Sequence, residues 1–178
     1  MKIILVRHAK TDYNCKGIMQ GRSNILLNDI GRRDAKELRD KLRDIKIDYC
    51  YMSPLVRCVE TAFIVIGDRA EMIRDDRLIE RDLGKLEGKD RSTYDVNKYW
   101  DYDLNSNDKG VEPVRDIIAR CSDFLEYIKN KYPEDTCILI VSHSATCRAL
   151  KILLTNKELK GNLFEGNINN SEYMEFDI

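Results

Sequence analysis

The chain has 178 residues, which suits a single domain, and 43% of them are hydrophobic while 34% are charged, as in soluble globular proteins. Lysine plus arginine (30) nearly balance aspartate plus glutamate (31), so the formal net charge is −1. A sequence-independent nucleic-acid binder normally carries a strong basic excess, so this balance argues against a nucleic-acid partner. A local basic pocket remains compatible with it.

The sequence shows no signal for export, membrane insertion or a cysteine metal site. The first apolar run ends at Arg7, too early for a signal core, and no apolar stretch approaches the ~20 residues of a membrane span. None of the six cysteines forms a C-x-x-C pair. We therefore expect a cytoplasmic protein with reduced thiols and no membrane partner. The sequence does not indicate an oligomeric state.

Short apolar runs and amphipathic segments alternate through the first half of the chain. Ser53 and Pro54 are typical of a helix start, because serine caps helices and proline is tolerated at the first helical position. In chain order we predict a strand at 2–6, a turn-rich segment at 7–30, a helix at 31–46, a strand at 47–52, a helix from 53 to 67 and a weaker strand within 71–79.

The second half begins with an irregular segment, 81–112, and ends with the clearest periodic elements. Pro113 opens a helix with apolar residues at helical spacing, and 136–141 is a wholly apolar strand of the kind found in parallel sheets. A helix follows at 145–154, and the tail from Asn167 to Ile178 could add one or two edge strands.

Together these elements predict a three-layer α/β/α sandwich with a mostly parallel central sheet and an antiparallel edge strand near the C-terminus. No repeat or linker is visible, so residues 1–178 are expected to form one domain with a small insertion at about 89–112. The aromatic residues of that insertion would either border a pocket or simply pack inward. They are Tyr94, Tyr99, Trp100 and Tyr102.

Ionisable residues follow the predicted strands, where open α/β sheets bind their ligands. Each one alone has an ordinary interpretation as a structural or solvated side chain. At one sheet edge, however, two arginines, two histidines and a carboxylate would form a pocket for a dianion with an acid beside it. The residues are Arg7, His8, Arg57, Glu80 and His143.

Phosphate chemistry fits such a pocket. Arginine forks bind phosphate oxygens in pairs and stay charged, and helix starts near 54 and 144 would add backbone N–H donors. Histidine can act as a nucleophile toward phosphorus, and Glu80 could protonate a leaving alkoxide.

Five ordered motif blocks carry a resemblance to the phosphoglycerate mutase-like branch of the histidine phosphatase superfamily. An R-H pair alone would be a weak signal, but the blocks follow the family order from residue 5 to residue 144. They are LVRHAKTDYN (5–14), QG (20–21) with LNDIG (27–31), SPLVRCVETA (53–62), LIERDLGKLEG (78–88) and VSHS (141–144).

The resemblance implies roles for particular residues. His8 would take the phosphoryl group as phosphohistidine, and Glu80 would protonate the leaving oxygen and then help to activate water. Arg7, Arg57 and a cationic His143 would hold the phosphoryl oxygens, so that neither a metal nor another cofactor would be needed. The residues expected to bind substrate are Arg7, Asn14, Gln20, Gly21, Arg57, His143 and Ser144.

Some positions depart from the family pattern, and they bear on substrate contacts more than on catalysis. Ala9 and Ser144 replace glycines, Asn24 stands where aspartate is common, and Leu26 and Pro113 replace a proline and a serine.

A phosphatase is favoured over a mutase, because Leu83 replaces the mutase tyrosine and Glu87-Gly88 resembles the phosphatase members. The expected activity is metal-independent hydrolysis of a small-molecule phosphomonoester. The alternatives are mutase-type phosphoryl transfer and a non-catalytic phospho-ligand sensor. A two-histidine metal hydrolase would need further ligands that the spacing does not suggest.

Overall fold

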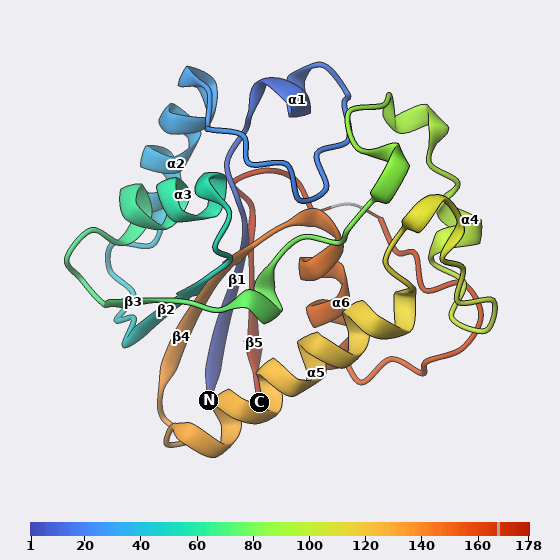
Figure 1. The fold of residues 1–178 in the computed structure, drawn as a ribbon. Coiled ribbons are helices and arrows are strands. Elements are labelled where there is room, and N and C mark those ends of the chain that lie inside the picture. Colours follow the sequence, from blue (N-terminus) through green and yellow to red (C-terminus); the bar gives the residue numbers. More distant parts are fainter. Residues whose placement is uncertain (167) are drawn as a thin grey trace.

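A computed structural model describes residues 1–178 except residue 167, and its architecture is the predicted three-layer sandwich (Figure 1). One five-stranded sheet has the order β3-β2-β4-β1-β5. Its strands are β1 (Lys2–Arg7), β2 (Tyr49–Met52), β3 (Glu71–Arg74), β4 (Cys137–Ser142) and β5 (Tyr173–Asp177). β5 is antiparallel to β1 and the other neighbouring pairs are parallel, which confirms the predicted edge strand.

Alternating side chains of the central strands feed two separate cores, one on each face of the sheet. On β1, Ile3 and Leu5 pack with the helices α5 (Val114–Lys131) and α6 (Ser144–Leu154). Ile4 and Val6 point the other way and pack with α2 (Asp29–Lys41) and α3 (Val56–Ile66). This period-two alternation is why wholly apolar strands suit a sheet covered on both faces.

The four long helices, α2, α3, α5 and α6, occur in the predicted order, but two of their boundaries differ. α2 ends at Lys41 rather than near 46. α3 begins at Val56, and its N-terminal residue Leu55 makes no side-chain capping bond. Ser53 is therefore not the helix cap that the sequence suggested. Asn24, which is distant in the sequence, caps the helix instead, because its Oδ1 accepts the Val56 N–H at 2.8 Å.

Segments expected to be irregular contain short helices. α1 (Asp12–Cys15) lies in the turn-rich region after β1, and α4 (Val96–Tyr99) lies in the insertion. Single 3₁₀ turns occur at Asp76–Leu78, Gly84–Leu86, Arg91–Thr93 and Asp108–Gly110. In Figure 1 these connections gather at the carboxyl ends of the parallel strands, away from the two chain termini.

Among the residues that the structure describes, the tail forms one strand, β5, rather than two. The predicted tail begins at Asn167, which lies outside the described residues. All six cysteines are described, and each is a free thiol, with Cys15 exposed and the others buried. No helix in the described part of the chain is long and apolar enough to cross a membrane.

Candidate active site

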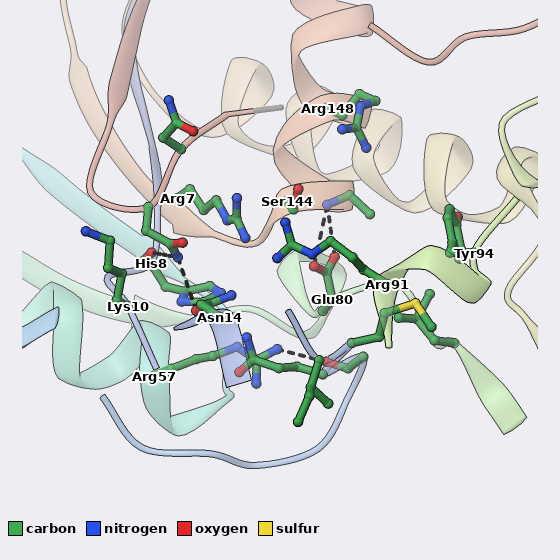
Figure 2. A pocket seen from close by; sticks show the side chains of 18 of the residues that line it. Arg7, His8, Lys10, Asn14, Arg57, Glu80, Arg91, Tyr94, Ser144 and Arg148 are labelled. Carbon is green, nitrogen blue, oxygen red and sulfur yellow. Dashed lines mark hydrogen bonds between the residues drawn. The ribbon is translucent and has the colours of Figure 1, made fainter. Parts of the chain in front are cut away.

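A cavity of about 410 Å³ opens where β1 and its parallel neighbours end, and eight of the predicted site residues line it (Figure 2). Its volume lies in the range of typical small-molecule sites. The lining residues that the sequence predicted are Arg7, His8, Asn14, Gln20, Gly21, Arg57, Glu80 and Ser144. His143 is not part of the lining.

His8 is buried and held in one tautomer. Its Nδ1 lies 2.7 Å from the carbonyl oxygen of Ala9, which can only accept, so the ring proton sits on Nδ1. Burial, followed by the positive charges of Arg57 and Arg7, lowers the pKa of His8 well below its ordinary value. His8 is therefore a neutral imidazole at neutral pH, and Nε2 keeps the lone pair that a nucleophile needs.

Two arginines flank this histidine, Arg57 fully buried and Arg7 half-buried, and the protein uses only some of their donors. The Nη1 of Arg7 donates to the carbonyl of Ile168 at 2.6 Å, while its buried Nε has no hydrogen-bond partner among the described residues. Arg57 is held by the carbonyls of Gly21 (2.8 Å) and Ser23 (2.7 Å). A guanidinium that is shielded from water needs an anionic partner. Both side chains therefore indicate that this cavity binds an anionic ligand.

His143 lies behind the pocket as a partner of Arg57. Its Nδ1 accepts from the Nε of Arg57 at 3.1 Å, and its Nε2 lies 2.7 Å from the hydroxyl of Ser53. Burial and the nearby charge of Arg57 lower its pKa well below the ordinary value. The expectation of a cationic His143 is therefore wrong, because a ring nitrogen that accepts a hydrogen bond from an arginine carries no proton.

Glu80 binds the N-terminus of α6, where the sequence led us to expect a phosphate group. Its Oε1 accepts from the backbone N–H groups of Arg81 (2.9 Å), Ala145 (3.2 Å) and Thr146 (3.3 Å). The last two N–H groups belong to the first turn of α6, where the helix dipole favours negative charge. Oε2 makes only a 3.5 Å contact with Ala145, so it is the oxygen left to exchange a proton with a ligand.

Asn14 is oriented as a donor toward the pocket by a small polar network. Its Oδ1 accepts from the N–H of Thr11 (3.1 Å) and from the Thr11 hydroxyl (3.0 Å), and it lies 3.4 Å from the Nδ2 of Asn170. With its oxygen occupied, its NH₂ group is the end left to donate to an anion. Gln20 joins the network because its Oε1 also lies 3.0 Å from the Thr11 hydroxyl, whose single proton the two amide oxygens share.

Asn170 also fixes the backbone at His8, and it is not among the site residues that the sequence predicted. Its Nδ2 donates to the carbonyl of His8 at 2.8 Å. The same loop donates to the Arg7 carbonyl through the N–H of Ser171 and accepts the Arg7 N–H at the carbonyl of Glu172. No local pattern in the tail signals this role, because the contact spans most of the chain.

The insertion contributes to the pocket and to the core at the same time. Tyr94 and Trp100 line the cavity, although Trp100 is only 1% exposed. Tyr99 instead packs in a third, smaller hydrophobic core with Met19 and Leu86. Arg91 and Arg148 line the cavity as well, and the sequence analysis passed over both. Arg148 lies four residues after Ser144 on α6, so i, i+4 spacing places the two residues on the same face of the helix.

Gly21 and Ser144 contribute mainly through their backbones and position. Gly21 has a φ of +48°, in the left-handed region that favours glycine, and a Cβ there would lie 2.0 Å from the carboxylate of Glu87 and displace it. Ser144 opens α6 at the pocket wall. In the described part of the chain, no group of three or more histidine, cysteine, aspartate or glutamate side chains is placed to hold a metal ion.

The fold and the site are those of an anion-binding α/β protein. A neutral histidine and two arginines line the same cavity. The chain belongs to the histidine phosphatase superfamily (branch 1), whose family model matches residues 3–177. Several of its curated relatives are named as phosphatases, which indicates a phosphatase-type member of this superfamily. The putative phosphoserine phosphatase 2 of Hydrogenobacter thermophilus is 33% identical over 99% of this chain and 89% of its own length.

The chain is also similar to a relative that is named a mutase. The 2,3-bisphosphoglycerate-dependent phosphoglycerate mutase of Rhizobium etli is 31% identical over 84% of this chain and 78% of its own length. Among solved structures, Bacillus stearothermophilus YhfR superposes with a TM-score of 0.86 at 26% identity, covering 98% of this chain and 89% of that one.

Proposed function

We propose that the protein is a metal-independent phosphatase that hydrolyses a small-molecule phosphomonoester through a phosphohistidine on His8. The observation that carries this proposal is the bond from His8 Nδ1 to the Ala9 carbonyl, which leaves Nε2 unprotonated beside Arg7 and Arg57. A cavity of about 410 Å³ suits a small molecule. Relatives named as phosphoserine phosphatases, such as that of Hydrogenobacter thermophilus, support the same reaction class.

In the first step the lone pair of His8 Nε2 attacks the phosphorus of the ester. The N–P bond forms while the P–O bond to the leaving alcohol breaks, and Glu80 Oε2 gives its proton to the departing oxygen. Arg7, Arg57 and the amide of Asn14 bind the equatorial oxygens, where charge builds up during transfer. His143 contributes through Arg57, because it fixes the Nε of that side chain.

In the second step a water molecule replaces the alcohol. Glu80, now ionised, accepts a proton from the water, whose oxygen attacks phosphorus as the N–P bond breaks. Inorganic phosphate leaves, and His8 and Glu80 return to their starting states. The phosphoryl charge stays within reach of both arginines throughout, so no further cation is required by this scheme.

The test is hydrolysis of p-nitrophenyl phosphate with and without EDTA, together with trapping of the phosphoenzyme. We expect full activity in EDTA, a label on the protein that is stable to base and labile to acid, and loss of both label and turnover in His8→Gln. Lys129→Ala, at an exposed position on α5, is the matched control. Unchanged turnover in His8→Gln would refute the proposal. Transfer of the label to an added phosphoglycerate faster than to water would assign the mutase activity instead.

A further inference from the structure

The side chain of Arg57 is held by a segment of backbone that lies outside the helices and strands. Its Nη2 donates to the carbonyl of Gly21 at 2.8 Å, a bond drawn as a dashed line in Figure 2, and its Nη1 donates to the carbonyl of Ser23 at 2.7 Å. We call residues 21–23 the guanidinium loop. The position of Arg57 therefore depends on where this loop holds its two carbonyl groups.

Each Nη of Arg57 keeps one N–H group that no described residue binds. A guanidinium has one N–H on Nε and two on each Nη. Nε donates to the Nδ1 of His143 at 3.1 Å, and each Nη gives one N–H to the guanidinium loop. The N–H groups that remain lie side by side on the fork, which is the arrangement that binds two oxygens of one phosphoryl group.

The guanidinium loop has few backbone hydrogen bonds of its own. The N–H of Ser23 donates to the carbonyl of Gln20 at 3.0 Å, which closes a single turn, whereas the N–H of Arg22 donates to a side chain. A loop with so few backbone bonds is held in place mainly by its contacts with the rest of the protein.

Glu87 supplies those contacts with both oxygens of its carboxylate. Oε1 accepts the N–H of Arg22 at 2.7 Å, and Oε2 accepts the hydroxyl of Ser23 at 2.9 Å. A Cβ on Gly21 would lie 2.0 Å from Oε1, so the carboxylate packs directly against that residue as well. Because hydrogen bonds to an ionised acceptor are stronger than neutral ones, this carboxylate is the main anchor of the guanidinium loop.

The backbone around Glu87 is itself tied to the segment that leads into the guanidinium loop. The N–H of Gly88 donates to the carbonyl of Met19 at 2.8 Å, and the N–H of Met19 donates to the carbonyl of Lys89 at 2.9 Å. These two bonds hold Glu87 beside the loop. Glu87 is not among the described residues that line the cavity, so it acts on a ligand there through the loop rather than by contact.

Glu87 also affects the charge of Arg57 without occupying the donors that a phosphoryl group needs. Burial lowers the pKa of Arg57, and the nearby carboxylates of Glu80 and Glu87 are among the groups that oppose this shift. A carboxylate paired directly with the guanidinium would take up its N–H groups, whereas Glu87 acts from behind the loop.

We propose that Glu87 is a positioning residue for Arg57, and that it holds the guanidinium loop so that the remaining N–H groups of Nη1 and Nη2 meet two oxygens of the transferred phosphoryl group. This inference rests on the proposed phosphatase function and adds a residue to it. The two glutamates of the block LIERDLGKLEG (78–88) then have different tasks, because Glu80 exchanges a proton with the ligand and Glu87 fixes an arginine.

The test is a double-mutant cycle between Glu87 and Arg57, followed through kcat/KM for p-nitrophenyl phosphate. In the wild-type background, Glu87→Ala should lower kcat/KM about tenfold, because the loop loses its anchor and Arg57 its fixed geometry. Arg57→Lys keeps a cation but lacks the planar fork that binds both carbonyls. In the Arg57→Lys background, Glu87→Ala should therefore lower kcat/KM by no more than about twofold.

Two milder variants keep the test decisive if Glu87→Ala does not fold. Ser23→Ala removes one of the two anchoring bonds and should lower kcat/KM about threefold in the wild type but not in Arg57→Lys. Glu87→Gln still offers an oxygen to the N–H of Arg22, so it should lose less activity than Glu87→Ala. Glu126→Ala, at an exposed position on α5, is the control and should leave kcat/KM unchanged in both backgrounds.

Equal losses in both backgrounds would overturn the positioning role, because a general structural effect does not depend on the side chain at position 57. Unchanged kcat/KM for Glu87→Ala in the wild-type background would overturn it as well. A wild-type protein that does not hydrolyse the ester would contradict the phosphatase proposal instead. The same cycle is then followed through the dissociation constant of inorganic phosphate, where equal changes in both backgrounds would again overturn the positioning role.

Discussion

The state of His8 is set by its neighbours rather than by its own ring. The Ala9 carbonyl holds the proton on Nδ1, and burial with the charges of Arg57 and Arg7 keeps the ring neutral. A free imidazole would be half protonated near pH 6.5 and would lose its nucleophilic lone pair there. Here the lone pair should survive to lower pH, which extends the working range on the acid side.

We therefore predict that neither histidine titrates near pH 6.5 in the protein without substrate. Since the pKa values of His8 and His143 are both lowered, ring resonances followed by NMR should stay in the neutral form down through that pH. The midpoint of the acid limb of the kcat/KM profile should likewise lie below pH 6.5. Arg57→Gln should raise the pKa of both rings, because it removes a nearby positive charge. A ring that titrates at or above pH 6.5 in the wild type would contradict this account.

Asn170 should act on the reaction without touching the substrate. Asn170→Ala removes the donor to the His8 carbonyl and one partner of Asn14. We expect kcat to fall by about tenfold, in line with ~1.4 kcal/mol for a positioning hydrogen bond, with a nearly unchanged melting temperature. Asn97→Ala, which removes an exposed bond to Asn162, is the control and should change neither quantity. If kcat is unchanged in Asn170→Ala, the loop has no positioning role.

At the scale of elements, α2 packs against the segment that follows His8 through a close approach between Gly31 and Lys10. A Cβ there would lie 2.1 Å from the carbonyl oxygen of Lys10 and 2.8 Å from its nitrogen. The same carbonyl accepts the N–H of Asn28, which also caps the helix. The glycine in the LNDIG motif therefore has a packing reason, since it lets a helix start directly against the backbone that follows His8.

Gly31→Ala should destabilise the protein by ~1–3 kcal/mol through overpacking. Helix propensity alone predicts the opposite sign, a gain of ~1 kcal/mol, so urea unfolding separates the two effects. Glu37→Ala on the exposed face of the same helix is the control, and its stability should stay close to that of the wild type. A Gly31→Ala protein that is as stable as the wild type would show that α2 can move away from Lys10 at little cost.

The sequence could predict the order of strands and helices because apolar periodicity is a local property. It could not place Ser53, which looked like a helix cap but bonds to His143 at 2.7 Å instead. It also could not foresee that Glu80 would occupy the α6 N-terminus. Stacks such as Trp100 with Arg148 join segments far apart in the chain, and only tertiary packing brings them together.

For the molecule as a whole, the two buried histidines couple folding to pH. The unfolded chain binds protons at its imidazoles near pH 6.5, whereas in the folded state the pKa values of both rings are lowered. Protons therefore favour the unfolded state, and the free energy of unfolding should be highest above pH 6.5 and decrease as the pH falls below it.

Urea unfolding at pH 7.5 and pH 5.5 measures this effect. Each pKa unit of lowering is worth ~1.4 kcal/mol at full protonation. The double variant His8→Gln, His143→Gln should lose most of the dependence within this window. An equally steep dependence in the double variant would assign the effect to other groups.

Because Asn170 and β5 complete the surroundings of β1, the order of synthesis matters for this protein. His8 directly follows β1, and β1 is synthesised before both of its partner strands, β4 and β5. Until residues 168–172 emerge, the His8 carbonyl lacks its donor and the Arg7 side chain its carbonyl partner. Products of premature termination should therefore contain an intact R-H motif but no assembled site, and the nascent chain should gain its chemistry in one late step.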